Sequence, residues 1–373
     1  MPAIRSPGQH VRRVTVVGAG SFGTAVALLL ERGGLRTTLL TRSAGQLEEL
    51  ARSRHNERYL PGVELPRDLR VRLLGADQDD LRRADLILLG VPSKVIAQVV
   101  GELLHLGVGE RSGIVSLAKG LVPPDGTPPT IALEEAFGPA RVACVGGPAH
   151  AREMVETGAG LVAASHSEVL AHGVAEAFQA GRVVCEVSDD PVGVELAGVA
   201  KNAAAVAVGA TQAQGLNAAG MAAADIFLEV LALALHRGGQ AKTFVGRAGT
   251  GDLVATALAP SSRNRTAGEL LAQGVPAAEI PGRVGQAVEA LDTVRLLAEA
   301  IKRAGLDAPV MSALARLIEG TLPLDDWVSM VRAQQPDPAR FAKRLRGRPG
   351  WWARLTSWLR ERFSSGRVES ERR

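Results

Sequence analysis

Lysine is scarce in this chain of 373 residues, and one lysine lies where a charged side chain is costly. Only six of the 43 basic residues are lysines, at positions 94, 119, 201, 242, 302 and 343. Lys201 stands in the run VELAGVAKNA, whose other residues are mainly small and apolar. Burial of an unpaired ammonium is unfavourable and lowers its pKa toward the range of a general acid or base. Lys201 is therefore a candidate catalytic group; the alternative is a lysine that reaches solvent from a helix edge.

Two later segments supply groups that suit a small phosphorylated substrate. The run GTGDLVAT contains Asp252, a carboxylate partner for a buried amine, with Thr256 one helical turn further on. The run SSRNR presents a hydroxyl, a guanidinium and an amide at Ser262, Arg263 and Asn264, a set that can bind a phosphate monoester. Taken alone, SSRNR is equally an ordinary helix cap with a solvated arginine.

A glycine-rich motif near the N-terminus predicts a dinucleotide site. The β-branched run RRVTVV leads into GAGSFG, with glycines at 18, 20 and 23, and the helical pattern TAVALLLERGG follows. This strand–loop–helix context is the one that the G-x-G-x-x-G fingerprint requires. Gly18 permits a tight turn, Gly20 lets backbone N–H groups approach the pyrophosphate, and Gly23 lets the helix pack on the strand. A bare tight turn is the alternative.

The end of the second predicted strand bears on which dinucleotide is bound. LRTTLL is followed by Thr41-Arg42-Ser43, about 20 residues beyond the glycines, where a site selective for NAD usually has an acidic residue. Arg42 suits the 2′-phosphate of NADP instead. A solvated surface arginine is the alternative.

Three further strand ends are expected to converge on one crevice. ADLILLGVP ends in the turn at Val91–Ser93, GIVSLAKGL places Lys119 just beyond its strand, and RVACVGGPAHARE turns at Gly147-Pro148. Ligands of open α/β sheets bind at the carboxyl ends of the strands. All three turns therefore belong to the same candidate site.

The pattern of elements predicts an α/β protein with an N-terminal Rossmann-type doubly wound sheet and a C-terminal all-α domain. We expect a dinucleotide-binding domain over 12–189 and a helical substrate domain over 190–334, with breaks at Pro260, Pro276 and Pro281. Residues 335–373 form a linker and a basic tail.

Composition and charge narrow the function classes. The segment 340–373 has 11 basic and 3 acidic residues, whereas the whole chain has a net charge of +4, so the body is acidic and shows no general nucleic-acid footprint. No uninterrupted apolar run reaches the length of a membrane span, and the N-terminus lacks the apolar core of a signal peptide. Cys144 and Cys185 indicate buried free thiols in a reducing cytoplasm.

The tail predicts an amphipathic helix. Trp351, Trp352, Leu355, Trp358, Leu359 and Phe363 gather on one side, and Arg354, Arg360 and Arg362 largely on the other. Such a helix can lie on an anionic membrane. We therefore expect a cytoplasmic protein with peripheral contact at the inner membrane face; packing against the body or a partner subunit is the alternative.

Taken in order, these motifs resemble those of bacterial NAD(P)-dependent glycerol-3-phosphate dehydrogenases over roughly residues 12–320. The matching segments are GAGSFGTA, VPS, AKGL, GGP, GVELAG with AKN, GTGDL with AT, SRNR with AG, and GQAVE. The resemblance implies reduction of dihydroxyacetone phosphate to sn-glycerol 3-phosphate for phospholipid synthesis. The cofactor expected from Arg42 is NADP, with NAD as the alternative.

Residue roles follow from the same resemblance. Lys201 matches the proton donor and acceptor, and Lys119 matches a lysine that contacts both cofactor and substrate. The implied substrate contacts are Gly147, Asp252, Ser262, Arg263 and Asn264. The implied cofactor contacts are Ser21, Phe22, Arg42, Tyr59, Ala151, Arg263 and Glu289. We expect Asp252, with Thr256 behind it, to hold the Lys201 ammonium, and the chemistry needs no metal.

Departures from the family pattern leave two other functions open. Ala149 and His150 stand where the family has a serine and an aromatic residue. The alternatives are a related reductase of another small keto acid or keto phosphate, and a catalytically weak NAD(P)-binding sensor. A homodimer is expected in each case.

Overall fold

The structure is a computed structural model that describes residues 7–8, 10–259, 262–285 and 288–333. The described residues up to Val331 form one compact unit. The predicted linker and amphipathic tail lie outside the described residues. The predicted division at 189/190 stays a prediction, although Asp190 marks an element boundary there because its side chain caps the helix that begins at Pro191.

An eight-stranded sheet organises the first half of the chain, as predicted. Its strand order is β10-β9-β8-β7-β6-β1-β2-β5, and neighbouring strands are parallel except β8 and β9. Apolar runs such as LILL in β6 are buried on both faces, as expected of a parallel sheet covered by helices. The strands are β1 (Arg13–Val17), β2 (Arg36–Thr41), β5 (Arg70–Leu73), β6 (Leu86–Leu89), β7 (Gly113–Ser116), β8 (Val142–Gly146), β9 (Gly160–Ser165) and β10 (Val184–Ser188).

Helices connect these strands, and a small hairpin projects from the sheet. The hairpin consists of β3 (His55–Asn56) and β4 (Leu60–Glu64). The helices are α1 (Ser21–Arg32), α2 (Ala44–Ser53), α3 (Asp79–Arg82), α4 (Ile96–Leu106), α5 (Pro129–Phe137), α6 (Ala151–Thr157) and α7 (Glu168–Ala180), with short 3₁₀ turns at Ser93–Val95 and Pro139–Arg141.

The topology brings four predicted turns to one edge of the sheet. Strands β1, β6, β7 and β8 are mutually parallel, so the glycine loop, the Val91–Ser93 turn, Lys119 and Gly147 all follow carboxyl ends. This arrangement is the one that forms a ligand crevice in doubly wound folds.

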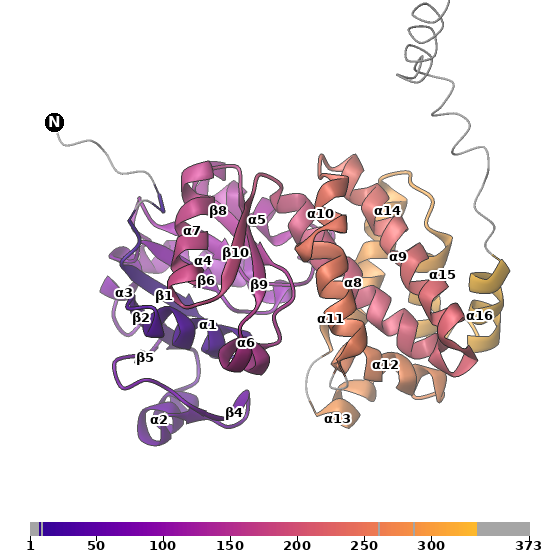
Figure 1. The fold of residues 1–373 in the computed structure, drawn as a ribbon, viewed down its shortest axis with the longest axis horizontal. Helices are drawn as coiled ribbons and strands as arrows, with labels where there is room; N and C mark the ends of the chain where they lie inside the picture. Colours follow the sequence, from indigo (N-terminus) through magenta and orange to yellow (C-terminus); the bar gives the residue numbers. More distant parts are fainter. Residues whose placement is uncertain (1–6, 9, 260–261, 286–287, 334–373) are drawn as a thin grey trace, which may run out of the picture. The chain divides into compact units, whose positions relative to one another are not determined.

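The second half of the chain is helical over its described residues, as predicted, and the strands of the described part all lie in the segment coloured indigo to magenta (Figure 1). Almost every residue of α8 is buried, which makes it the central helix of this half. The helices are α8 (Pro191–Thr211), α9 (Leu216–His236), α10 (Ala241–Val245), α11 (Asp252–Leu258), α12 (Arg263–Ala272), α13 (Ile280–Val284), α14 (Glu289–Arg303), α15 (Pro309–Ile318) and α16 (Leu324–Ala333), with a 3₁₀ turn at Gln212–Gln214 and a π-helical turn at Arg247–Gly251.

The expected helix break at Pro281 is wrong. Pro281 lies in the first turn of α13, which begins at Ile280. Proline is tolerated there because the first N–H groups of a helix have no intrahelical partner. Pro260 lies outside the described residues, and Pro276 falls between α12 and α13.

Two helices are long and apolar enough to cross a membrane by length and composition alone. They are the segment Pro191–Gln214 and α9. The first is mostly buried as the core helix of the bundle, whereas α9 is buried over less than half of its apolar window. A core helix buried within a bundle has the same length and apolar composition as a membrane-spanning helix.

Candidate functional site

The glycine loop between β1 and α1 has the shape of a phosphate cradle. Gly18 has φ +111°, and a Cβ there would lie 2.5 Å from the Gly90 carbonyl oxygen. A Cβ at Gly23 would lie 2.1 Å from the Gly18 oxygen, so only glycine lets α1 pack this closely. A Cβ at Gly20 would meet nothing within 4 Å, so the space beside the loop is open. The N-terminus of α1 at Ser21 and Phe22 faces this loop, a geometry that fits a pyrophosphate.

Two amide side chains hold the loop, and the sequence did not reveal either. Gln46 and Asn56 both donate to the Ala19 carbonyl, at 2.8 and 3.0 Å, and Asn56 also donates to Thr24 Oγ1 at 2.7 Å. Asn56 is in the β3–β4 hairpin, which also carries the predicted cofactor contact Tyr59. Asn56 therefore attaches the hairpin that carries Tyr59 to the glycine loop.

The two predicted catalytic lysines meet at one buried carboxylate. Lys119 donates to Asp252 Oδ2 at 2.6 Å and to the Gly147 carbonyl at 2.8 Å. Lys201 Nζ lies 3.3 Å from Asp252 Oδ1 and donates to Thr256 Oγ1 at 2.9 Å. The side chain of Asp252 is 0% exposed and that of Lys201 is 10% exposed. Five groups from four separate stretches of the sequence thus form one cluster.

Burial and mutual charge set the proton affinities in this cluster. Burial, followed by the Lys119 ammonium, lowers the pKa of Lys201 to about 8, although the Asp252 carboxylate opposes both effects. Burial alone would raise the pKa of Asp252, but the ammonium groups of Lys119 and Lys201 hold it below its usual range. Lys201 is therefore an amine that can exchange a proton near neutral pH, beside a carboxylate that stays ionised.

A chain of amides ties the cluster to α12. Asn202 donates to the Lys119 carbonyl at 3.0 Å, and Asn264 donates to Asn202 Oδ1 at 2.8 Å. Asn202 follows Lys201 directly in α8. Sequence reasoning did not assign it a role, and its only signal was its place in the AKN motif.

The start of α12 places the predicted phosphate-binding residues beside this cluster. Ser262 is the N-cap, and its hydroxyl accepts from the Arg265 N–H, so the cap interpretation of SSRNR holds for this residue. The charge of Arg263 lowers the pKa of Lys201 and also acts on Glu289, whose pKa is raised mainly by burial. Arg263 therefore lies within electrostatic reach of both the lysine cluster and a predicted cofactor contact.

Close packing of α8 and α12 explains how these residues come together. A Cβ at Gly209 of α8 would lie 2.0 Å from the Arg265 carbonyl oxygen, and one at Gly268 of α12 would lie 2.1 Å from the Val206 oxygen. The two helices approach this closely because each has glycine at the crossing. The small residues of α8 thus bring Asn264 within hydrogen-bonding distance of Asn202.

The loop after β8 contributes a side chain that was noted only as a departure. His150 is the N-cap residue of α6, but its ring makes no capping bond and is half-buried. Burial lowers its pKa, and the Lys201 charge lowers it further. The imidazole therefore lies within electrostatic range of the cluster, one residue before the predicted cofactor contact Ala151.

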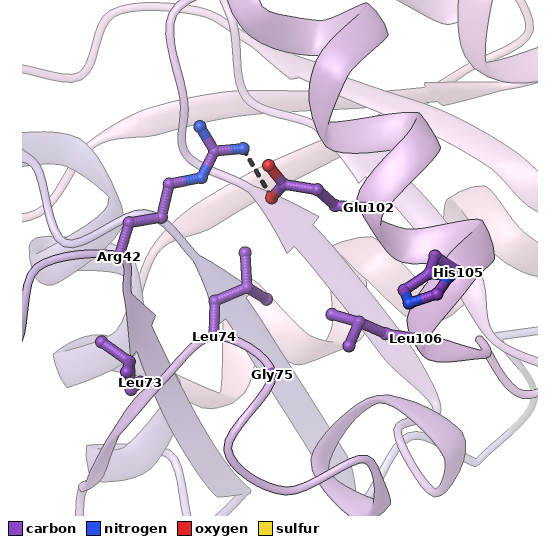
Figure 2. Close-up of a pocket in the computed structure, with 7 residues that line it drawn as sticks. All are labelled: Arg42, Leu73, Leu74, Gly75, Glu102, His105 and Leu106. Carbon is purple, nitrogen blue, oxygen red and sulfur yellow. Dashed lines mark hydrogen bonds and ion pairs between the residues drawn. The ribbon is translucent and has the colours of Figure 1, made fainter.

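Two cavities are each lined by a predicted cofactor contact. One, of about 510 Å³, is lined by Glu289 together with Pro92 and Lys94 from the turn after β6. The other, of about 330 Å³, lies at the end of β2 and is lined by Arg42, Glu102 and His105 (Figure 2). Among the described residues, no three His, Cys, Asp or Glu side chains form a group that could hold a metal ion.

The predicted residues thus fall into two groups. Lys119, Gly147, Lys201, Asp252, Thr256 and Asn264 are joined by hydrogen bonds and ion pairs, with Arg263 within electrostatic reach. Most of the predicted cofactor contacts lie at the glycine loop, the end of β2, the hairpin and the start of α6, whereas Lys119 and Arg263 belong to the first group and Glu289 begins α14. A doubly wound sheet with a phosphate cradle, followed by a helical bundle that supplies a titratable lysine, defines a dinucleotide-dependent dehydrogenase.

Comparisons with known proteins identify the family within this class. Residues 13–171 match the N-terminal model, and residues 190–329 the C-terminal model, of NAD-dependent glycerol-3-phosphate dehydrogenase. Glycerol-3-phosphate dehydrogenases [NAD(P)+] from two Anaeromyxobacter strains are 36% and 35% identical to the chain, covering 87% of it and 99% of each relative. The crystal structure of glycerol-3-phosphate dehydrogenase from Coxiella burnetii is 27% identical, with a TM-score of 0.78 over 88% of this chain and 100% of that one. The chain belongs to the NAD-dependent glycerol-3-phosphate dehydrogenase family.

Proposed function

We infer that the chain reduces dihydroxyacetone phosphate to sn-glycerol 3-phosphate with NADPH or NADH and so supplies glycerophospholipid synthesis. The observation that carries this inference is the pair of lysines on one buried carboxylate, beside the N-terminus of α12. A phosphorylated ketone needs a proton donor at its carbonyl oxygen and cations for its phosphate. The cluster and Arg263 offer both.

The residue roles are proposals built on this geometry. The nicotinamide supplies the hydride when it is bound. Lys201 donates a proton to the carbonyl oxygen as the alkoxide forms and is then neutral until solvent returns the proton. Asp252 and Thr256 hold the Lys201 amine in place, and Lys119 orients the substrate with its positive charge. Arg263 and Asn264 bind the phosphate, with Ser262 at the same helix end.

Oxidation of NADPH in the presence of different ketones tests this function. We expect turnover with dihydroxyacetone phosphate and little with pyruvate or ketopantoate. Preference for one of the other two ketones would favour the related reductase that Ala149 leaves open. Cofactor binding without turnover of any ketone would favour the sensor.

Replacement of the proposed proton donor tests the mechanism separately. Lys201→Ala should lower kcat by about 10²- to 10⁴-fold, the usual contribution of a general acid, and leave NADPH affinity nearly intact. The exposed Lys302, which is in α14, gives a matched control as Lys302→Ala. Equal turnover of the Lys201→Ala variant and the control would show that the assignment is wrong.

We propose that the chain is a cytoplasmic homodimer. The two cysteines of the chain, Cys144 and Cys185, are buried free thiols, which suits a reducing compartment. On α9, Met221, Leu228 and Leu235 recur every seven residues and are all exposed, which places them along one side of the helix. A second copy of the chain could cover this apolar stripe by two-fold symmetry.

We also propose that the tail contacts the inner membrane face. The support is the arrangement of tryptophans and arginines in the sequence, since residues 334–373 lie outside the described part. The full chain should sediment with vesicles of anionic phospholipid, and a chain ending at Gly350 should not. Equal sedimentation of both would contradict the proposal.

A further inference from the structure

An ion pair crosses the cavity at the end of β2, where the sequence predicted only an arginine. Arg42 donates through Nη2 to Glu102 Oε2 at 2.8 Å, and the two side chains are 40% and 35% exposed. Glu102 comes from α4, 60 residues further along the chain. Figure 2 shows the pair together with Leu73, Leu74, Gly75, His105 and Leu106. Arg42 is therefore engaged by a carboxylate and is not simply a solvated side chain.

The carboxylate of Glu102 is held from two sides. Gln98, one turn earlier on α4, donates to Glu102 Oε1 at 3.0 Å, while Arg42 bonds Oε2. Both oxygens thus have donors, and the negative charge is kept at the guanidinium. A freely rotating surface glutamate would not stay there.

The position of the pair connects it to the cofactor. In dinucleotide-binding folds, the residue just beyond the second strand reads the 2′ position of the adenosine ribose, and an arginine there accommodates the 2′-phosphate. A 2′-phosphate bound by Arg42 would lie next to the Glu102 carboxylate. A phosphate and a carboxylate next to the same guanidinium repel each other, and the repulsion is strongest at low ionic strength.

We propose that Glu102 determines the cofactor preference of this chain by occupying Arg42 and disfavouring the 2′-phosphate, so that NADH competes with NADPH. The inference rests on the proposed function, because it concerns the adenosine end of the same dinucleotide site. Arg42 favours the 2′-phosphate and Glu102 counteracts it. The preference is then set by a residue outside the glycine motif and outside the β2 signature.

Equilibrium binding of NADPH and NADH without ketone tests the proposal. Isothermal titration calorimetry gives both dissociation constants for the wild-type chain and for Glu102→Gln, which keeps the side-chain shape and removes the charge. We expect Glu102→Gln to raise the preference for NADPH over NADH about tenfold, with a smaller gain at high salt. Arg42→Gln should lower the preference for NADPH.

A matched control separates this effect from net charge. Glu176→Gln removes one carboxylate from the exposed side of α7 and should leave the preference unchanged. An unchanged preference in Glu102→Gln, with both cofactors still bound, overturns the inference and leaves the proposed function intact. A wild-type chain that binds neither cofactor overturns both.

Discussion

At the scale of single residues, the shared carboxylate of Asp252 controls the proton affinity of Lys201. Two ammonium groups next to each other destabilise both charges, and burial adds to this effect. Asp252 accepts from Lys119 and lies beside Lys201, so it offsets part of the repulsion. The result is a Lys201 pKa of about 8, well below its ordinary value of 10.5. Ketone reduction by a protonated Lys201 should therefore decline above about pH 8.

Removal of the Asp252 carboxylate should shift the Lys201 pKa in a known direction. Asp252→Asn removes the negative charge, which raises the Lys201 pKa together with the hydrogen bond to the same side chain. The pKa should therefore fall below 8, and less of the acid is protonated at neutral pH. The falling limb of kcat/KM against pH should move down by about one unit or more, as expected for loss of an adjacent opposite charge. Steady-state kinetics of dihydroxyacetone phosphate reduction across this pH range measure the shift.

Thr256→Val serves as the milder comparison, because it removes only the hydroxyl that accepts from Lys201. It should shift the limb in the same direction by a smaller amount. A limb that does not move in Asp252→Asn would mean that Lys201 is not the titrating group.

At the scale of elements, α8 is fastened to the nucleotide-binding half by a buried glutamate. Glu195, 4% exposed, accepts from the Thr130 backbone N–H at 3.0 Å and from the Thr130 hydroxyl at 2.6 Å. It thereby satisfies donors in the first turn of α5, where a negative charge also interacts favourably with the helix dipole. Lys201 and Asn202 lie on the same helix, so the bonds between Glu195 and Thr130 attach the helix that carries them to the start of α5.

This glutamate should make stability depend on pH. Burial raises its pKa to about 7, against the bonds from Thr130. The folded state then binds more protons than the unfolded state between about pH 4.5 and 7. The contribution of Glu195 to the free energy of unfolding is therefore full at low pH and declines as pH rises through 7. The decline is on the order of 3 kcal/mol over this window.

The variant Glu195→Gln, which does not titrate, isolates that contribution. The free energy of unfolding of the wild type should fall relative to that of Glu195→Gln as pH rises from about 5 to 7.5. Denaturant unfolding at each pH measures it. A difference independent of pH would show that Glu195 titrates like an exposed glutamate.

At the scale of the whole molecule, the apolar stripe of Met221, Leu228 and Leu235 on α9 is exposed in a single copy of the chain. Leu228 is 62% exposed, although α9 packs against the central helix α8 through its opposite side. Contiguous exposed apolar side chains indicate an interaction surface.

Light scattering after size exclusion tests whether a second copy covers this stripe. The wild-type chain should run at twice the mass of the 39.0 kDa monomer, and Leu228→Glu should shift it toward the monomer because a charge cannot be buried unpaired at the interface. Leu104→Glu changes a leucine of similar exposure on α4, 55% against 62% for Leu228, and should leave the dimer intact. A monomeric wild type would exclude the homodimer.

The sheet, the glycine loop and Lys201 could be predicted from the sequence because the patterns that indicate them are local. The glycine motif and its flanks predicted β1 and α1, alternating strands and helices predicted the doubly wound sheet, and a lysine in an apolar run pointed to Lys201. The period of apolar residues and the turn residues that end an element lie within a few positions of one another, so they can be recognised in the sequence.

Only the tertiary structure decided which distant groups share a contact. The use of one carboxylate by Lys119 and Lys201, the amide chain through Asn202 and the pairing of Arg42 with Glu102 each join residues from different elements. Such contacts depend on helix packing, here on the glycines that let α8 and α12 approach, and on the order of strands in the sheet. Helix packing and strand order cannot be predicted from the spacing of residues along the chain. The free energy of a buried charge depends on the groups that surround it in space.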